Sequence, residues 1–125
     1  MTPLRSLLID SLLIAVLTAC SGGAPASSVV PPEADPRVTA EGNVFDAEAI
    51  TLTAAETNTL SFTNLDGQPH NVAIYADESA QESLFVGEMI TDDAITYEIP
   101  ALEPGEYFFR CDAHPAMTGT VVVEG

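Results

Sequence analysis

Short strand-like runs separated by turn residues occupy most of the chain after position 50, and they leave little room for helices. Apolar and polar residues alternate in residues 50–53, 60–63 and 94–99, which is the period of a half-buried strand. Further strand-like runs cover residues 71–75, 106–110 and 118–123, and a polar insertion at 77–83 has room for one helical turn. Short strands at regular spacing predict an all-β, antiparallel sandwich.

The composition predicts one acidic domain. With 125 residues, 46% of them hydrophobic, the chain can fill one modest core. Its net charge of −16 results from 19 acidic residues against three arginines. Such a surface repels phosphate backbones, which argues against nucleic-acid binding. A basic protein partner and a high-salt habitat both remain open as explanations.

The N-terminus is predicted to direct export and lipid attachment. Arg5 precedes a largely apolar run at 7–17, and residues 17–20 (Leu-Thr-Ala-Cys) match a bacterial lipobox. We therefore expect residues 1–19 to be the signal peptide of a lipoprotein and Cys20 to be lipidated after cleavage. The alternative, a transmembrane anchor, is disfavoured because the apolar run is shorter than the roughly 20 residues of a span. Lipidation would hold the protein at the periplasmic or extracellular face of a bacterial membrane.

A flexible tether is expected to follow Cys20. Residues 20–37 are rich in glycine, alanine, serine and proline, a composition typical of linkers. We place the folded domain at 38–125, so that it would move above the membrane on this tether.

The cysteine count points to a metal. The chain has two cysteines, and lipidation of Cys20 would leave Cys111 as a lone thiol in an oxidising compartment, where burial or a metal must protect it. His114 and Met117 follow Cys111 in a Cys-x-x-His-x-x-Met pattern, and His70 follows a turn far upstream. Taken singly, each has an ordinary explanation as a surface or core residue. Together these soft and borderline donors suit copper in both oxidation states, whereas zinc is disfavoured because a thioether binds it poorly.

These motifs resemble the cupredoxins, the small blue-copper proteins. The resemblance covers roughly residues 38–124, and the motifs that carry it are residues 69–72, 102–107 and 111–117. The second motif is similar to the family's tyrosine corner, and the third is most similar to the ligand loop of amicyanin. The resemblance implies a single cupredoxin-like, antiparallel Greek-key β-sandwich that binds one Cu(I)/Cu(II) ion. By the same resemblance, the strong ligands are His70, Cys111 and His114, and the weak axial ligand is Met117. It also implies a supporting role for Asn71, with an amide hydrogen bond to the cysteine sulfur.

The function implied is electron transfer rather than catalysis. Binuclear, multicopper and nitrite-reductase sites need more cysteines or histidines than this chain has, and no open coordination position lies beside an acid or base. We therefore expect a monomeric carrier of single electrons whose partner is a redox protein such as a cytochrome, a dehydrogenase or an oxidase. The alternatives are a protein that stores or delivers Cu(I), and a binding module that has lost copper.

Three residues near the proposed ligands carry separate expectations. Arg110 is expected to pair with one of the many carboxylates. Asp112, next to the thiolate, is expected to favour Cu(II) and so lower the reduction potential if its carboxylate lies near the metal. Electrons are expected to enter through the ring edge of His114.

Overall fold

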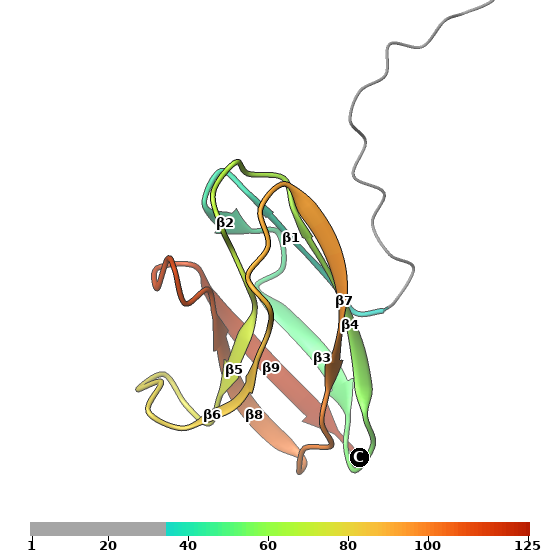
Figure 1. Ribbon diagram of the computed structural model, residues 1–125. Coiled ribbons are helices and arrows are strands. Elements are labelled where there is room, and N and C mark those ends of the chain that lie inside the picture. The colour runs from blue at the N-terminus through green and yellow to red at the C-terminus, as the bar shows by residue number, and fades with distance from the viewer. Residues whose placement is uncertain (1–34) are drawn as a thin grey trace, which may run out of the picture.

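The structure is a computed structural model, which describes residues 35–125 (Figure 1). The predicted signal peptide (1–19) and the lipidation site Cys20 lie outside the described residues, as does the predicted tether except for its last three positions. Arg37, the last residue of that tether, begins the first strand. Within the described residues no helix is long and apolar enough to cross a membrane.

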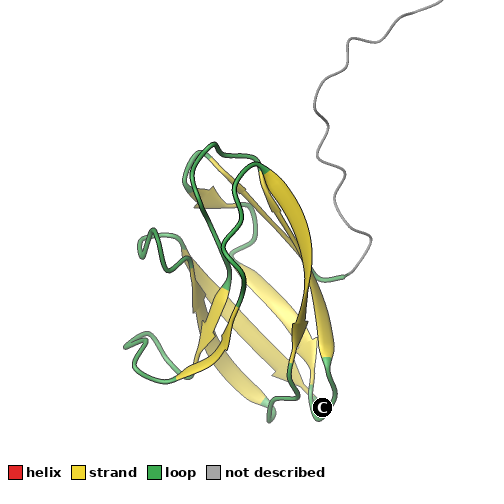
Figure 2. Cartoon of the chain, viewed as in Figure 1, coloured by secondary structure: helices red, strands yellow, loops and turns green. Residues whose placement is uncertain are grey.

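The described chain consists of strands and loops, as Figure 2 shows. In chain order the strands are β1 Arg37–Glu41, β2 Val44–Phe45, β3 Ala49–Thr53, β4 Asn58–Asn64, β5 Ala73–Tyr75, β6 Ser83–Val86, β7 Asp93–Ile99, β8 Gly105–Arg110 and β9 Thr118–Glu124. The predicted strands are all present, with ends that differ by one or two residues. The insertion at 77–83 contains turns in place of a helical turn, since Ser79 N–H donates to the Asp77 side chain and Ala80 has a positive φ of 51°.

Two sheets face each other and form the predicted cupredoxin sandwich. One has the strand order β2-β1-β4-β7 and the other β3-β9-β8-β5-β6. Most neighbouring strands are antiparallel, but β1 pairs with β4 and β3 pairs with β9 in parallel. Parallel neighbours arise because β3, between β1 and β4 in sequence, lies in the opposite sheet. When the chain returns to the first sheet, β4 runs in the same direction as β1. Local sequence patterns do not indicate this parallel pairing.

The core lies between the sheets and is built from the inward-facing residues of the alternating strands. Phe62 and Phe109, one from each sheet, have no exposed surface, and the rings of Phe62 and Tyr97 stack with centroids 5.7 Å apart. Gly119 is required beside Phe109, because a Cβ at that position would lie 2.3 Å from the Phe109 ring. The strand that leads into Cys111 is therefore tightly packed around Phe109.

The predicted tyrosine corner is present before β8. The hydroxyl of Tyr107 donates a 2.7 Å hydrogen bond to the carbonyl oxygen of Glu103. This bond ties the start of β8 to the preceding turn. Since β8 ends directly before Cys111, the corner fixes the opposite end of the strand that positions the cysteine.

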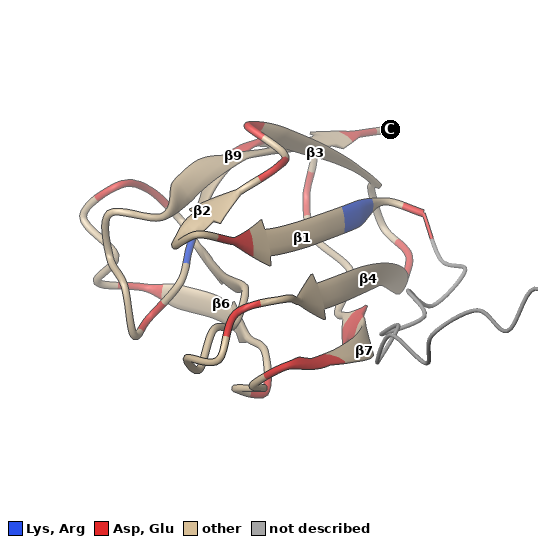
Figure 3. Ribbon diagram, turned by 90° about the horizontal axis from the view of Figure 1, so that it is seen from above, with Lys and Arg blue, Asp and Glu red and all other residues tan. Residues whose placement is uncertain are grey.

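The charge of the described surface is almost entirely negative. All acidic residues of the chain except Asp10 and Glu33 lie in the described part, whose basic residues are Arg37 and Arg110. Figure 3 shows the acidic residues, coloured red, spread over several strands and loops. The negative charge is thus a property of the whole domain rather than of one patch.

Candidate metal centre

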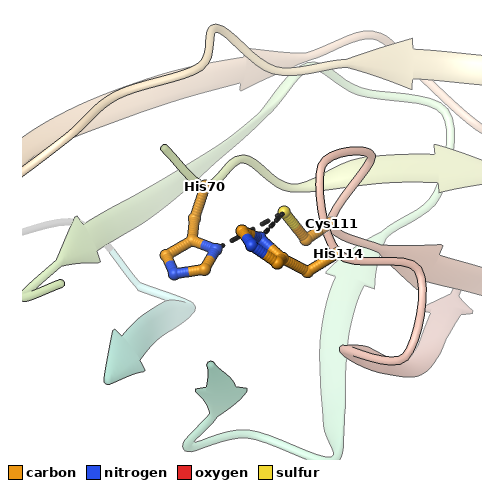
Figure 4. A group of neighbouring side chains, drawn as sticks. All are labelled: His70, Cys111 and His114. Carbon is orange, nitrogen blue, oxygen red and sulfur yellow. Dashed lines mark hydrogen bonds between the residues drawn. The ribbon is translucent and has the colours of Figure 1, made fainter. Parts of the chain in front are cut away.

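Three metal-binding side chains converge at one end of the sandwich. One donor atom each of His70, Cys111 and His114 lies within 4.8 Å of the other two. The Cys111 sulfur is 3.6 Å from Nδ1 of His70 and 3.9 Å from Nδ1 of His114. Figure 4 shows the two imidazoles and the sulfur directed toward a common point. His70 and Cys111 have no exposed surface, whereas His114 is half-buried.

The loop that joins β8 to β9 supplies two of these residues and Met117. It is closed by two backbone hydrogen bonds, from Cys111 N–H to the Met117 carbonyl at 3.0 Å and from Met117 N–H to the His114 carbonyl at 2.9 Å. Met117 is 4% exposed and belongs to the core cluster. The short loop therefore holds all three residues in a fixed backbone frame at the end of two paired strands.

His70 comes from a different part of the chain and is fixed by its backbone. Its N–H and carbonyl both pair with Ile90, each at 3.0 Å, in an isolated bridge. This confirms the predicted position of His70 at the entry to the strand after the turn. The sandwich thus brings together donors 41 residues apart in sequence.

Asp66, which no sequence motif singles out, contacts the far side of the His70 ring. One carboxylate oxygen, Oδ2, lies 2.8 Å from Nε2 of His70. The backbone N–H groups of Asn43 and Gly42 also donate to this carboxylate and hold the pKa of Asp66 below its usual value. The available signal was a carboxylate four residues before a candidate ligand.

Asn71 joins the two segments that carry the donors. Its side-chain oxygen accepts from Asp112 N–H at 2.9 Å, and its Nδ2 donates to the Gly87 carbonyl at 3.0 Å and lies 3.4 Å from an Asp112 oxygen. The bond to the cysteine sulfur that the resemblance implied is not among these side-chain contacts. Asn71 acts instead as a clamp between the His70 strand and the cysteine loop.

Asp112 is surrounded by hydrogen-bond donors, which reduce the effect of its negative charge on the metal centre. The Tyr75 hydroxyl donates to Oδ1 at 2.5 Å, and this bond raises the pKa of Tyr75. Arg110 Nε lies 3.3 Å from the same oxygen, and the guanidinium covers the Tyr75 ring. Arg110 therefore pairs with a carboxylate as expected, and the carboxylate is the one beside the thiolate. The positive charge of Arg110 offsets the negative charge of Asp112, which by itself is expected to lower the reduction potential.

The donor set fits copper. A thiolate, two imidazoles and a thioether lie between the soft sulfur preference of Cu(I) and the nitrogen preference of Cu(II). Cys111 is a free, buried cysteine, and the His70 ring already has a carboxylate partner on its outer nitrogen, as metal-binding histidines usually do. The grouping of these four residues is that of a type 1 copper site.

Comparison with known proteins agrees with this site. The family model for the cupredoxin-like domain matches residues 11–123. The chain belongs to the cupredoxin-like family. Among curated cupredoxin relatives, it is 40% identical to amicyanin of Paracoccus versutus over 75 residues, which are 60% of this chain and 54% of amicyanin. It is 33% identical to plastocyanin A/B of Petroselinum crispum over 66% of this chain and 89% of plastocyanin. The chain thus spans about half the length of the amicyanin sequence.

Solved cupredoxin structures share the fold. The crystal structure of Paracoccus versutus amicyanin superposes with a TM-score of 0.57 at 31% identity, covering 78% of this chain and 94% of amicyanin. Auracyanin A of Chloroflexus aurantiacus, described as a "blue" copper protein, superposes with a TM-score of 0.60 over 70% of this chain and 96% of auracyanin. Its identity of 19% supports the fold alone.

Proposed function

We propose that this cupredoxin is a mononuclear type 1 copper protein that carries single electrons between redox partners. The observation that carries the proposal is the convergence of a buried thiol and two imidazoles within 4.8 Å. In this assignment His70, Cys111 and His114 are the strong ligands and Met117 is the weak axial ligand.

A bound copper ion would supply a one-electron couple between Cu(I) and Cu(II). The chain's own contribution is rigidity. His70 is held by its bridge to Ile90, and the loop residues are held by the two backbone bonds that close it. Because both oxidation states would find the same donors in the same places, little would move when an electron arrives. We propose no enzymatic activity, since the four donors fill the coordination sphere of the ion.

We propose His114 as the point where electrons enter and leave. His114 is half-buried, whereas His70 and Cys111 have no exposed surface. Its neighbours in the loop, Pro115 and Ala116, are exposed and uncharged, so a partner can approach closely there. The partner would be another redox protein, and the acidic remainder of the domain favours one with a basic surface.

Delivery of Cu(I) to another protein is a weaker alternative. Transfer of Cu(I) between proteins requires a ligand of the acceptor to reach the ion, and the Cys111 sulfur has no exposed surface. The relatives named above include no copper-delivery protein.

We also propose that the protein is exported and anchored by lipid on Cys20, as a monomer at the outer face of a membrane. The support is the lipobox at 17–20 and the abundance of small residues and proline in residues 20–37. Mass spectrometry of the protein from membranes of the native host tests this. Diacylglycerol on an N-terminal Cys20 is expected, and an unmodified N-terminus elsewhere in the chain would contradict it.

Voltammetry and partner kinetics test the electron-transfer proposal. The copper-loaded protein should give a reversible one-electron couple, and Ala116→Trp should slow electron exchange with a small redox protein because it separates the partner from His114. Ala101→Trp is the matched control, since Ala101 is also exposed but lies in the loop between β7 and β8. Irreversible voltammetry would contradict the electron-carrier function. Equal slowing by the two substitutions would contradict the assignment to His114.

A further inference from the structure

The carboxylate of Asp66 links a hairpin turn to the ring of His70. Gly42 and Asn43 form the two-residue turn between β1 and β2, with positive φ values of 64° and 59°. Their N–H groups donate to Asp66 over 2.8 and 3.0 Å. On its other side the same carboxylate contacts Nε2 of His70. These three parts of the chain come together only in the folded sandwich.

The backbone of Asp66 is also fixed. Its N–H donates to the Asn64 side-chain oxygen over 2.8 Å, and its carbonyl accepts from Asp92 N–H over 3.2 Å. The Asn64 amide in turn donates to the carbonyls of Gln68 and Ile90, and Ile90 is the residue that bridges to His70. The carboxylate and the imidazole are therefore held in the same hydrogen-bonded frame.

The chemistry of these contacts decides which nitrogen of His70 carries hydrogen. An ionised carboxylate can only accept hydrogen bonds, and Oδ2 of Asp66 already accepts from the turn. Nε2 of His70 must then be the donor, so in the neutral ring Nδ1 carries the free lone pair. Nδ1 is the atom that faces the Cys111 sulfur at 3.6 Å. The outer carboxylate thus prepares the inner nitrogen to bind a metal.

We propose that Asp66 is the positioning residue of the copper site, which selects the Nε2–H tautomer of His70 and strengthens Nδ1 as a ligand. This inference rests on the proposed copper-binding function. A negative charge on the far side of the imidazole makes Nδ1 a better electron donor. Asp66 therefore favours Cu(II) over Cu(I) and lowers the reduction potential.

The competing explanation is that Asp66 only anchors the β1–β2 turn. In that case its loss would affect stability and leave His70 unchanged. The two explanations differ in their effect on the imidazole itself. Asn is the informative substitution, since it keeps the shape but replaces one acceptor oxygen with an NH₂ group. The carboxylate now has three donors: the N–H groups of Gly42 and Asn43, and Nε2–H of His70. Whichever way the amide of the variant is oriented, its NH₂ group faces at least one of them.

A matched control is available in the same hairpin. Asp46 accepts a 2.7 Å hydrogen bond from Thr39 N–H, so it is also a carboxylate that ties down this hairpin. Unlike Asp66, Asp46 has no hydrogen bond to His70 in the part of the chain that the structure describes. Asp46→Asn therefore removes a negative charge from the same hairpin without touching the imidazole, and its amide oxygen can still accept from Thr39 N–H.

The first experiment needs no variant. Nitrogen-15 NMR of the imidazoles in the metal-free wild-type protein reports the tautomer directly, and His114 provides the comparison within the same spectrum. We expect His70 to be the Nε2–H tautomer with a strongly hydrogen-bonded proton. Hydrogen on Nδ1 of neutral His70 would overturn the proposal, whether or not any substituted protein folds.

The second experiment compares Asp66→Asn, Asp46→Asn and wild type. Asp66→Asn is expected to weaken Cu(II) affinity by about 10- to 100-fold and to raise the reduction potential, with Asp46→Asn close to wild type in both. Equal values for the two variants would overturn the proposal. Failure of the proposed copper function would give a different result. The wild type would then fail to bind copper or to show a reversible couple, while the NMR result on the metal-free protein would still test the role of Asp66.

Discussion

The side-chain oxygen of Asn71 accepts a 2.9 Å hydrogen bond from the backbone N–H of Asp112. Asn71 follows His70 and Asp112 follows Cys111, so this single bond joins the two segments that meet at the metal centre. The same side chain donates to Gly87, which lies beside β6. The geometry of the site thus depends on an amide that is 1% exposed as well as on the donors themselves.

Substituting Asn71 with Ala should loosen the site. The Asp112 N–H would lose its partner in a partly buried position, at a cost of about 1–3 kcal/mol in unfolding free energy. The copper spectrum should also shift, because Cys111 and His70 would no longer be tied together. Urea unfolding and electron paramagnetic resonance measure the two effects.

Asn58→Ala is the control for that experiment. Asn58 makes side-chain bonds to Thr53 and Glu56 in the turn before β4, away from the site. We expect it to lower stability while leaving the copper spectrum unchanged. A spectrum that is also unchanged in Asn71→Ala would contradict the role of Asn71 as a clamp.

Arg110 is expected to raise the reduction potential by offsetting the charge of Asp112. Removing the guanidinium in Arg110→Gln leaves the carboxylate beside the thiolate uncompensated, which favours Cu(II). The potential should fall by roughly tens of millivolts, the scale of a partly screened charge at this distance. Asp112→Asn should shift it in the opposite direction, and voltammetry of both variants measures the changes. A fall in potential in Asp112→Asn would be incompatible with this electrostatic account.

The strands and the donor residues could be predicted because their signals are local. Alternation identified β3, β4 and β7, whereas no strand was predicted at β1, β2 or β6. The turn before His70 placed it at a sheet end, and Cys111 to Met117 form one contiguous motif. Asp66 was not assigned, because a carboxylate four residues before a candidate ligand is a weak signal on its own. The turn contacts that hold this carboxylate come from residues 23 and 24 positions away. The parallel pairing of β1 with β4 depends likewise on how the chain crosses between sheets.

The partners of polar side chains were the least predictable feature. The hydrogen bonds of the Asn71 side chain go to Asp112 and Gly87, partners that the sequence pattern does not indicate. The prediction for Arg110 names no particular carboxylate, because spacing in the sequence does not distinguish Asp112 from the many other acidic residues. These choices follow from side-chain directions on neighbouring strands, which are set only once β5 and β8 are paired.

Tyr97 should make the protein sensitive to alkaline pH. Burial raises the pKa of Tyr97 above the usual value for tyrosine, about 10, and its hydroxyl donates to the Glu88 carbonyl. Since the unfolded chain ionises more easily, this contribution to stability is complete below about pH 10. It is lost as the pH rises further. Unfolding free energies of the copper-loaded protein at neutral pH and above pH 10 should show the loss.

Tyr97→Phe is expected to be less stable at neutral pH, because it lacks the hydrogen bond, and to lose less stability on going to alkaline pH. The comparison uses the difference between the two proteins, so other groups that titrate above pH 10 cancel. Parallel curves for wild type and Tyr97→Phe would contradict the assignment of this pH dependence to Tyr97.

The visible absorption spectrum of the copper-loaded protein tests the central claim most directly. A Cu(II) ion bound to the Cys111 thiolate should give an intense band toward the red end of the spectrum, which disappears on reduction. In Cys111→Ser this band should be absent even where copper remains bound at the histidines. Wild-type protein that binds Cu(II) without the band, or a band that persists in Cys111→Ser, would contradict the assignment of a type 1 copper site to these residues.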